Sequence, residues 1–129
     1  MRFISILFLT LLALTACSSP PPPTSSEELP PGNASRGEAL FSQAINGAPP
    51  CSTCHTINGD RLVGPSLQGY SDAAPTRVAG VSAGDYTLTS IVQPAAYLVS
   101  GFGNIMYNQY TQKLTSQQIA DLIAYLLTL

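Results

Sequence analysis

The chain has 129 residues, of which 45% are hydrophobic and 9% are charged, and its formal net charge at pH 7 is −2. This length is enough for one hydrophobic core with appended segments. The low, nearly balanced charge argues against nucleic-acid binding and against a partner recognised mainly through long-range electrostatics.

An export signal is predicted over residues 1–16. Arg2 precedes an uncharged run from Phe3 to Ala16, which has the length of a signal-peptide core and is short for a membrane span. The run closes with Leu14-Thr15-Ala16-Cys17, which resembles the lipobox of bacterial lipoproteins and implies a lipidated Cys17 at the mature N-terminus. The alternative is a retained N-terminal helix that anchors the chain.

Residues 17–32 form the predicted linker, in which Cys17 is followed by a Pro/Ser-rich stretch. Residues 18–32 contain six prolines and little to bury. In an extended form of about 3.1 Å per residue, this stretch would reach roughly 45 Å from a membrane. A disordered leader without a set reach is the alternative.

Residues 33–129 are predicted to form an all-α domain, because their apolar residues recur with helical spacing and no strand pattern is convincing. A first helix begins near Asn33, capped by Asn33 or Ser35, with Glu38 as the capping-box partner of Ser35.

Two further helices are expected in the second half of the chain. One runs from Tyr86 to Gln93 and ends before Pro94. The clearest begins after Thr115, which has Gln118 as a capping-box partner. Its apolar residues recur with a spacing of three and four: Ile119, Leu122, Ile123 and Leu126.

The sequence Cys51-Ser52-Thr53-Cys54-His55 is the attachment pattern of a c-type haem. Cys51 and Cys54 are spaced to add across the two vinyl groups as thioethers, and His55 then reaches the iron. A redox dithiol and half of a zinc site are the alternatives. The first needs a βαβ surrounding, which the pattern lacks, and the second needs ligands that one remaining cysteine and no further histidine do not supply.

Met106 is the candidate for the second axial iron ligand. His55 is the only histidine, and the other methionine, Met1, begins the export signal. A thioether is a soft, neutral ligand that suits haem iron. The alternative for an isolated methionine is a core-filling role.

From Asn33 to Leu129 the chain resembles a class I cytochrome c. The residues that carry the resemblance follow the order of the family pattern: Gly37 and Phe41 on the first helix, the haem motif, Gly64-Pro65, Met106, and Leu122 and Tyr125 on the last helix. The resemblance implies crossing terminal helices around one covalent haem c. It also implies that the Pro65 carbonyl accepts a hydrogen bond from His55. One departure is Tyr107, which stands where the family usually has proline after the ligand methionine.

The resemblance further implies an electron-transfer protein, with no substrate of its own, whose haem edge is rimmed by Cys51, Ser52 and the Met106 loop. With the lipobox, the expected location is the outer (periplasmic) face of a bacterial membrane, between a quinol-oxidising complex and an oxidase or reaction centre. A fixed subunit of a larger complex, such as alternative complex III, is the main alternative. A five-coordinate haem enzyme or gas sensor is a weaker one. Candidate propionate partners are Arg61, Tyr70 and Arg77, which follow the haem motif, and the alternative for each is a solvated surface residue.

Overall fold

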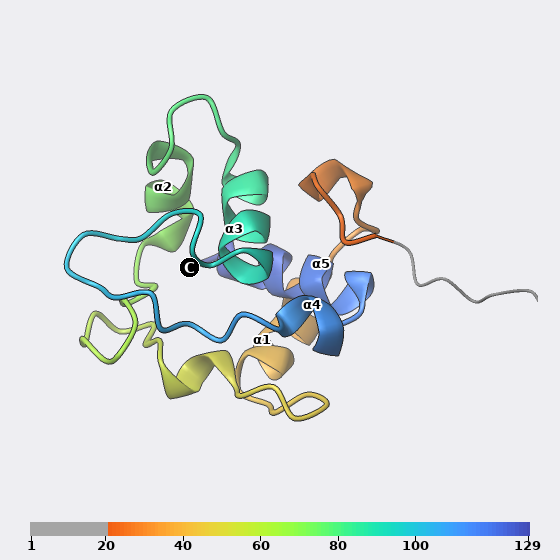
Figure 1. Cartoon of the computed structure of the whole chain (residues 1–129), viewed down its shortest axis with the longest axis horizontal. Coiled ribbons are helices and arrows are strands. Elements are labelled where there is room, and N and C mark those ends of the chain that lie inside the picture. Colours follow the sequence, from red (N-terminus) through yellow and green to blue (C-terminus); the bar gives the residue numbers. More distant parts are fainter. Residues whose placement is uncertain (1–20) are drawn as a thin grey trace, which may run out of the picture.

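The computed structural model describes residues 21–129, so the predicted signal segment and Cys17 lie outside the described residues. Figure 1 shows helical elements joined by long loops. In chain order they are η1 (Ser26–Glu28), α1 (Ala34–Phe41), η2 (Cys51–Thr53), α2 (Tyr70–Ala73), η3 (Ala74–Thr76), α3 (Ala83–Val92), α4 (Tyr110–Lys113) and α5 (Ser116–Leu126). The predicted all-α fold is confirmed, since the only β pairing within residues 21–129 is an isolated bridge.

The first and last long helices, α1 and α5, cross in direct contact, and Gly37 lies at the crossing. A Cβ atom at Gly37 would lie 1.9 Å from the carbonyl oxygen of Asp121 and 2.7 Å from Cβ of Tyr125. Only glycine allows this approach without a backbone shift. One turn later, the rings of Phe41 and Tyr125 pack with centroids 5.7 Å apart. This is the helix crossing that the resemblance implies.

A buried carboxylate ties the start of α1 to α5. Asp121 is only 2% exposed, and its two oxygens accept from Nε and Nη2 of Arg36 at 2.7 and 2.8 Å. It also accepts from the Asn33 amide at 2.8 Å and from Gln117 at 2.9 Å. The Arg36 guanidinium, before the other donors, lowers the pKa of Asp121. The buried charge is therefore fully partnered, as burial requires.

The hydrophobic core lies between α1, α3 and α5 and the start of the haem motif. Its most buried large side chains are Leu88, Leu122, Ile119, Phe41 and Tyr110. Leu40, Cys51, Met106 and Tyr107 pack against it while remaining partly exposed.

The helix starts agree only in part with the sequence prediction. The capping box of Thr115 and Gln118 on α5 is confirmed. Asn33 caps α1 by accepting from the Arg36 amide at 3.0 Å. Ser35 therefore lies inside α1, and its predicted capping box with Glu38 is wrong. The middle helix begins at Ala83 instead of Tyr86, because the Ser82 hydroxyl accepts from the Asp85 amide at 3.0 Å and starts the helix one turn earlier.

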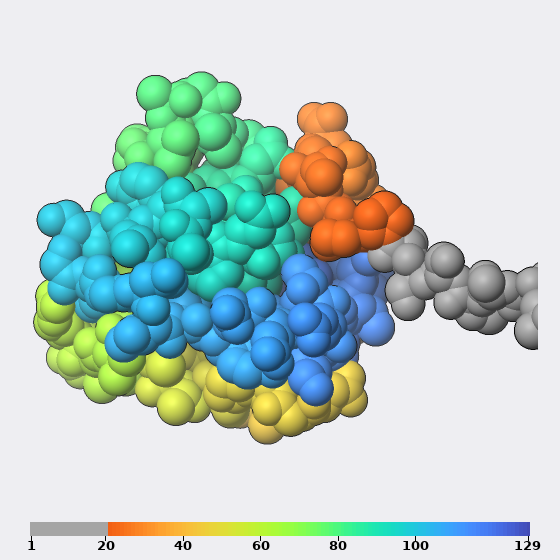
Figure 2. Space-filling model, viewed as in Figure 1, coloured from red at the N-terminus to blue at the C-terminus, as the bar shows by residue number. Residues whose placement is uncertain are grey.

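Residues 24–32, here called the N-terminal strap, are folded onto the domain. Ser26 donates to Oδ1 of Asp85 from its amide at 2.7 Å and from its hydroxyl at 2.8 Å. Further along, Gln117 donates to the Pro31 carbonyl at 3.0 Å. A Cβ at Gly32 would lie 2.2 Å from the Ala120 carbonyl oxygen, so the backbones are in close contact. Figure 2 shows the strap in orange as a ridge on the folded body.

The strap corrects the predicted extended spacer. The sequence predicts an extended stalk over residues 18–32, because this stretch contains six prolines and little to bury. Over residues 24–32, hydrogen bonds from the domain and packing of Leu29 against the core hold the segment down instead. Within the described part of the chain, the helices are all too short or too polar to span a membrane.

Candidate haem-binding site

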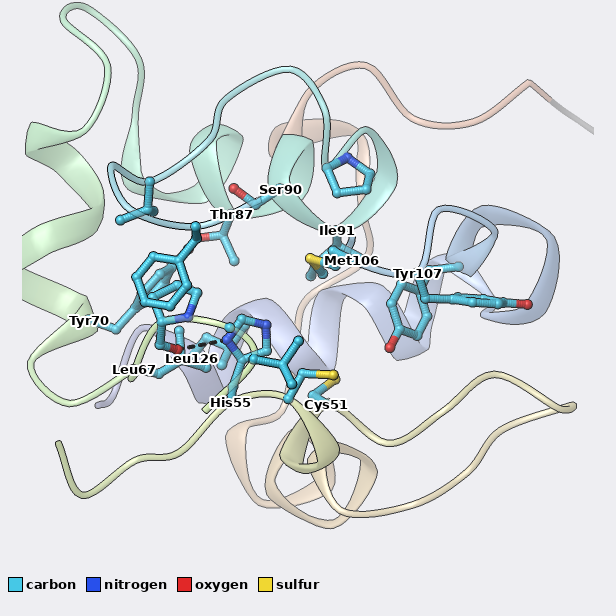
Figure 3. A pocket seen from close by; sticks show the side chains of 18 of the residues that line it. Cys51, His55, Leu67, Tyr70, Thr87, Ser90, Ile91, Met106, Tyr107 and Leu126 are labelled. Carbon is cyan, nitrogen blue, oxygen red and sulfur yellow. Dashed lines mark hydrogen bonds between the residues drawn. The ribbon is translucent and has the colours of Figure 1, made fainter. Parts of the chain in front are cut away.

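A largely apolar pocket lies between the loop that follows His55 and the segment that carries Met106. It is lined by side chains from the haem motif, the loop that follows it, α2, α3, α5 and the segment between α3 and α4, among them Leu67, Tyr70, Ile91, Phe102 and Leu126. Figure 3 shows the labelled lining side chains around one space, with Cys51 and His55 on one wall and Met106 on the wall across from them.

The turn of η2 presents the haem motif to this pocket. The amides of Cys54 and His55 both donate to the Cys51 carbonyl, at 3.1 and 3.0 Å. This tight turn places Cys51, Cys54 and His55 in the pocket lining, while Ser52 and Thr53 are not part of it. The motif therefore forms one helical turn that presents both thiols and the imidazole to the pocket.

The orientation of the imidazole is set by the next loop. Nδ1 of His55 lies 2.8 Å from the carbonyl oxygen of Pro65, as Figure 3 shows with a dashed line. Because a carbonyl only accepts, Nδ1 must carry the hydrogen, and Nε2 keeps its lone pair. The loop is held close by the Gly64 amide, which donates to the Cys54 carbonyl at 2.9 Å.

Gly64 is needed for this arrangement. A Cβ atom at this position would lie 2.6 Å from Cε1 and 2.8 Å from Nδ1 of His55. Real side chains do not approach so closely, so any residue other than glycine would push the imidazole away from its place.

The first cysteine of the motif lies in apolar surroundings. Burial, the largest effect, raises the pKa of the Cys51 thiol to about 11. At neutral pH this thiol is protonated, whereas redox-active dithiols depend on a lowered thiol pKa. The environment therefore disfavours the redox-dithiol interpretation of the motif.

Met106 lies in the pocket lining and packs partly buried against the core. The residue after it, Tyr107, stands in place of the usual proline and packs edge-on against Tyr110, with centroids 5.0 Å apart and planes at 74°. Tyr110 is itself fixed, because its hydroxyl donates to the Pro49 carbonyl at 2.9 Å, just before the haem motif. An aromatic pair thus holds the chain next to Met106.

The three candidate propionate partners are placed differently. Tyr70 and Arg77 line the pocket. The Tyr70 hydroxyl pairs with Oγ1 of Thr87 at 3.0 Å, and burial raises the pKa of Tyr70 to about 12. Arg61 is outside the lining, and its guanidinium lies against the loop at residues 101–102.

Other pocket residues were not predicted from the sequence. Thr87 is fully buried, and its hydroxyl donates to the Ala83 carbonyl at 2.6 Å. Tyr86 and Tyr97 pack edge-on with centroids 5.6 Å apart. No local motif marks these residues. The only signal is the concentration of tyrosines in the second half of the chain.

The residues present fit a covalently attached haem. The pocket brings together two thiols, an imidazole with a free Nε2, a thioether across from it and a mainly hydrocarbon lining. Thiols bind vinyl groups, imidazole and thioether are haem-iron ligands, and an apolar lining suits a porphyrin. Fold and pocket together define an all-α protein of the c-type haem class.

Comparison with known families agrees with this class. The family model described as Cytochrome c matches residues 34–129, and the chain belongs to the cytochrome c family. The comparison with curated proteins found no match. The protein therefore binds covalently attached haem c and is an electron carrier, with the class I fold that its crossing helices display.

Proposed function

We propose that the protein carries single electrons on one haem c that is bound through thioethers to Cys51 and Cys54 and ligated axially by His55 and Met106. The observation that carries this proposal is the placement of His55 and Met106 on facing walls of one pocket that the two cysteines also line. The haem, when bound, supplies an iron that accepts and returns one electron.

The chain's own residues determine what that iron does. Pro65 orients His55 and increases the electron donation of the imidazole through its hydrogen bond. Met106 would fill the remaining axial position, and Met/His ligation raises the reduction potential. With His55 and Met106 both holding the haem iron, no position would be left for a substrate, and the chemistry would be outer-sphere electron transfer.

Docking of partners is proposed at the mouth of the pocket through apolar contacts. Val63, Leu98 and Ile105 line the pocket and are nevertheless 55, 46 and 67% exposed. Exposed apolar side chains gathered at a functional site are typical of interaction surfaces. Residues 33–129 contain four basic and five acidic residues and only one lysine, so the dense ring of lysines that steers some carriers to their partners cannot be built.

We further propose that lipidated Cys17 tethers the protein to the outer face of a bacterial membrane. There it would carry electrons between a quinol-oxidising complex and an oxidase or reaction centre. Because the strap is folded onto the domain from residue 24, only residues 18–23 separate the anchor from the folded body. Six extended residues span at most about 22 Å, so the haem would stay closer to the membrane than an extended linker allows.

A second candidate is a fixed subunit of a larger respiratory or photosynthetic complex, such as alternative complex III. Val63, Leu98 and Ile105, here called the apolar rim, and the low charge of the chain favour this candidate, since a permanent interface is more apolar than a transient one. Purification from native membranes separates the two: a mobile carrier is isolated alone in mild detergent, whereas a subunit is isolated with its complex.

Carbon monoxide tests the carrier function itself. The reduced full-length holoprotein is expected to bind the gas slowly and incompletely, because Met106 blocks the iron. Rapid, complete binding would instead show an open coordination position on the iron and favour a haem enzyme or gas sensor. The feature of the sequence that supports this alternative is Tyr107, which stands where the family usually has proline.

A further inference from the structure

Two loops meet at the mouth of the pocket, and each is next to one of the proposed iron ligands. The loop of residues 56–67 follows His55 and is fixed to the haem motif by the amides of Gly64 and Leu67, which donate to the carbonyls of Cys54 and Thr56 at 2.9 and 2.7 Å. The loop of residues 95–109 carries Met106. Any contact between these loops therefore connects the two sides of the iron site.

Arg61 makes that contact. Its Nη2 donates to the carbonyl oxygen of Gly101 at 2.6 Å, and its guanidinium carbon lies 4.1 Å from the centroid of the Phe102 ring. Within residues 21–129, the Arg61 to Gly101 bond is the only hydrogen bond that joins the two loops. Phe102 also lines the pocket, so the arginine fixes a residue that belongs to the site.

The packing of Tyr107 on Tyr110 holds the Met106 loop at its C-terminal end, whereas the turn around Gly101 has features that favour a support from outside the loop. Gly101 has a positive φ of 84°, and Tyr107 takes the place of a proline that would restrict the backbone. The internal bonds of the loop are short-range: the Phe102 amide donates to the Val99 carbonyl and the Ile105 amide to the Gly103 carbonyl, both at 3.0 Å. Bonds of this kind shape the turn at residues 99–105 and do not themselves tie it to the rest of the domain.

We propose that Arg61 is a positioning residue, which clamps the Met106 loop to the loop that follows His55 and so holds the methionine sulfur in its place across the pocket. The expected effect of the clamp on the haem iron rests on the proposed function, in which Met106 is an iron ligand. The effect of the clamp on the position of the loop does not depend on whether Met106 binds iron.

The chemistry of the contact requires arginine. A planar guanidinium stacks on an aromatic ring and donates to a carbonyl at the same time. A lysine ammonium is a compact, strongly hydrated charge, and it lacks the flat surface and the fixed arrangement of N–H donors that this double contact needs. Arg61→Lys is therefore expected to keep the charge and lose most of the clamp.

The test uses the full-length holoprotein and three variants that affect the clamp, Arg61→Gln, Arg61→Lys and Phe102→Leu. The matched control is Lys113→Gln, which also removes one positive charge from a side chain that makes no hydrogen bond or ion pair within residues 21–129. Two properties are measured in each protein. The first is hydrogen exchange at the backbone amides of positions 102 and 105. The second is the far-red charge-transfer band of the oxidised haem, which reports the bond between iron and methionine sulfur.

Loss of the clamp is expected to speed exchange at both amides by on the order of tenfold, the combined effect of one hydrogen bond and one cation–π contact. The far-red band is expected to weaken in the same three variants and stay unchanged in Lys113→Gln.

Exchange rates in Arg61→Gln within about twofold of wild type would overturn the clamp, even with Met106 bound to iron. If wild type lacks the far-red band, the ligation proposal fails, and the exchange rates alone decide whether the clamp stands. An equal loss in Lys113→Gln would show a general effect of charge and would also overturn the clamp.

Discussion

Nδ1 of His55 and the carbonyl oxygen of Pro65 lie 2.8 Å apart, and this contact determines which nitrogen of the only histidine faces the pocket. Since Nδ1 donates to a carbonyl, Nε2 is the nitrogen left for iron. The neighbouring Gly64 makes the contact possible, because its missing side chain leaves room for the imidazole edge. The site therefore depends on a residue that has no functional group.

Gly64→Ala is predicted to damage the site. The added Cβ would lie 2.6 Å from Cε1 of His55, and relieving that overlap must move the imidazole or the loop. We expect a loss of about 1–3 kcal/mol in the free energy of unfolding of the holoprotein, which is typical of overpacking. Denaturant unfolding followed by haem absorbance measures it.

Gly103→Ala is the matched control for this prediction. Gly103 also lines the pocket, but its added Cβ would meet only Cγ2 of Ile105, at an ordinary 3.9 Å. Equal stability losses in the two variants would contradict the role given to Gly64.

The strap is predicted to give the protein a specific dependence on acid. The backbone N–H of Ser26, followed by the hydroxyls of Ser82 and Ser26, lowers the pKa of Asp85 from 3.8 to about 2. The folded state thus favours the carboxylate, so its stabilising effect is complete above pH 3.8 and is lost as the pH falls toward 2. Unfolding measured across this window should show a loss of stability in the wild type.

Asp85→Asn is expected to remove that part of the pH dependence and to lower stability by about 1–3 kcal/mol at neutral pH, because hydrogen bonds to a charged acceptor are lost. Asp72→Asn is the control, since Asp72 is exposed in α2 and away from the strap. If the pH profile of Asp85→Asn matches that of Asp72→Asn, the strap is not held by the Asp85 carboxylate.

Electron transfer is predicted to depend weakly on salt. The Debye length shrinks from about 30 Å at 0.01 M to about 3 Å at 1 M ionic strength, which strongly slows electrostatically steered partners. For this protein, the rate at which native membranes oxidise the reduced holoprotein should change by less than roughly threefold over that range of ionic strength, because the proposed docking is apolar. A fall of about a hundredfold would show that electrostatic steering dominates.

The role of the apolar rim in docking can be tested with a substitution in the same assay. Ile105→Ser should slow the reaction, since Ile105 lines the pocket and is 67% exposed. Ile57→Ser is the control, since Ile57 is also exposed, at 47%, and is not part of the pocket lining. Equal rates in the two variants would place the docking surface elsewhere.

Membrane attachment is predicted to depend on Cys17. In the wild type, mass spectrometry of the membrane form should show acyl chains on the N-terminal Cys17, and Cys17→Ala should block their addition. At about 0.8 kcal/mol per buried CH₂, two or three acyl chains hold a protein stably on a bilayer. An unmodified Cys17 in the membrane form would point to a retained N-terminal helix as the anchor.

The sequence predicts well what depends on neighbouring residues. The motif from Cys51 to His55 is contiguous, so its chemistry is visible without a structure. The start of α5 is visible in the same way, because Thr115 and Gln118 lie within one turn and satisfy each other's backbone amides.

What the sequence did not reveal depends on partners far apart in the chain. Ser26 and Asp85 are separated by 59 positions, so the prolines between residues 18 and 32 suggested an extended linker although the strap folds back. The pairing of Tyr70 with Thr87 and the bridge from Arg61 to Gly101 likewise appear only when the loops are folded together.

The far-red absorption band of the oxidised full-length holoprotein tests the central claim most directly, because it reports haem iron bound to methionine sulfur. We predict that the wild type shows this band and that Met106→Ala loses it while keeping the thioether-bound haem. Absence of the band in the wild type, or its persistence in Met106→Ala, would contradict axial ligation by His55 and Met106.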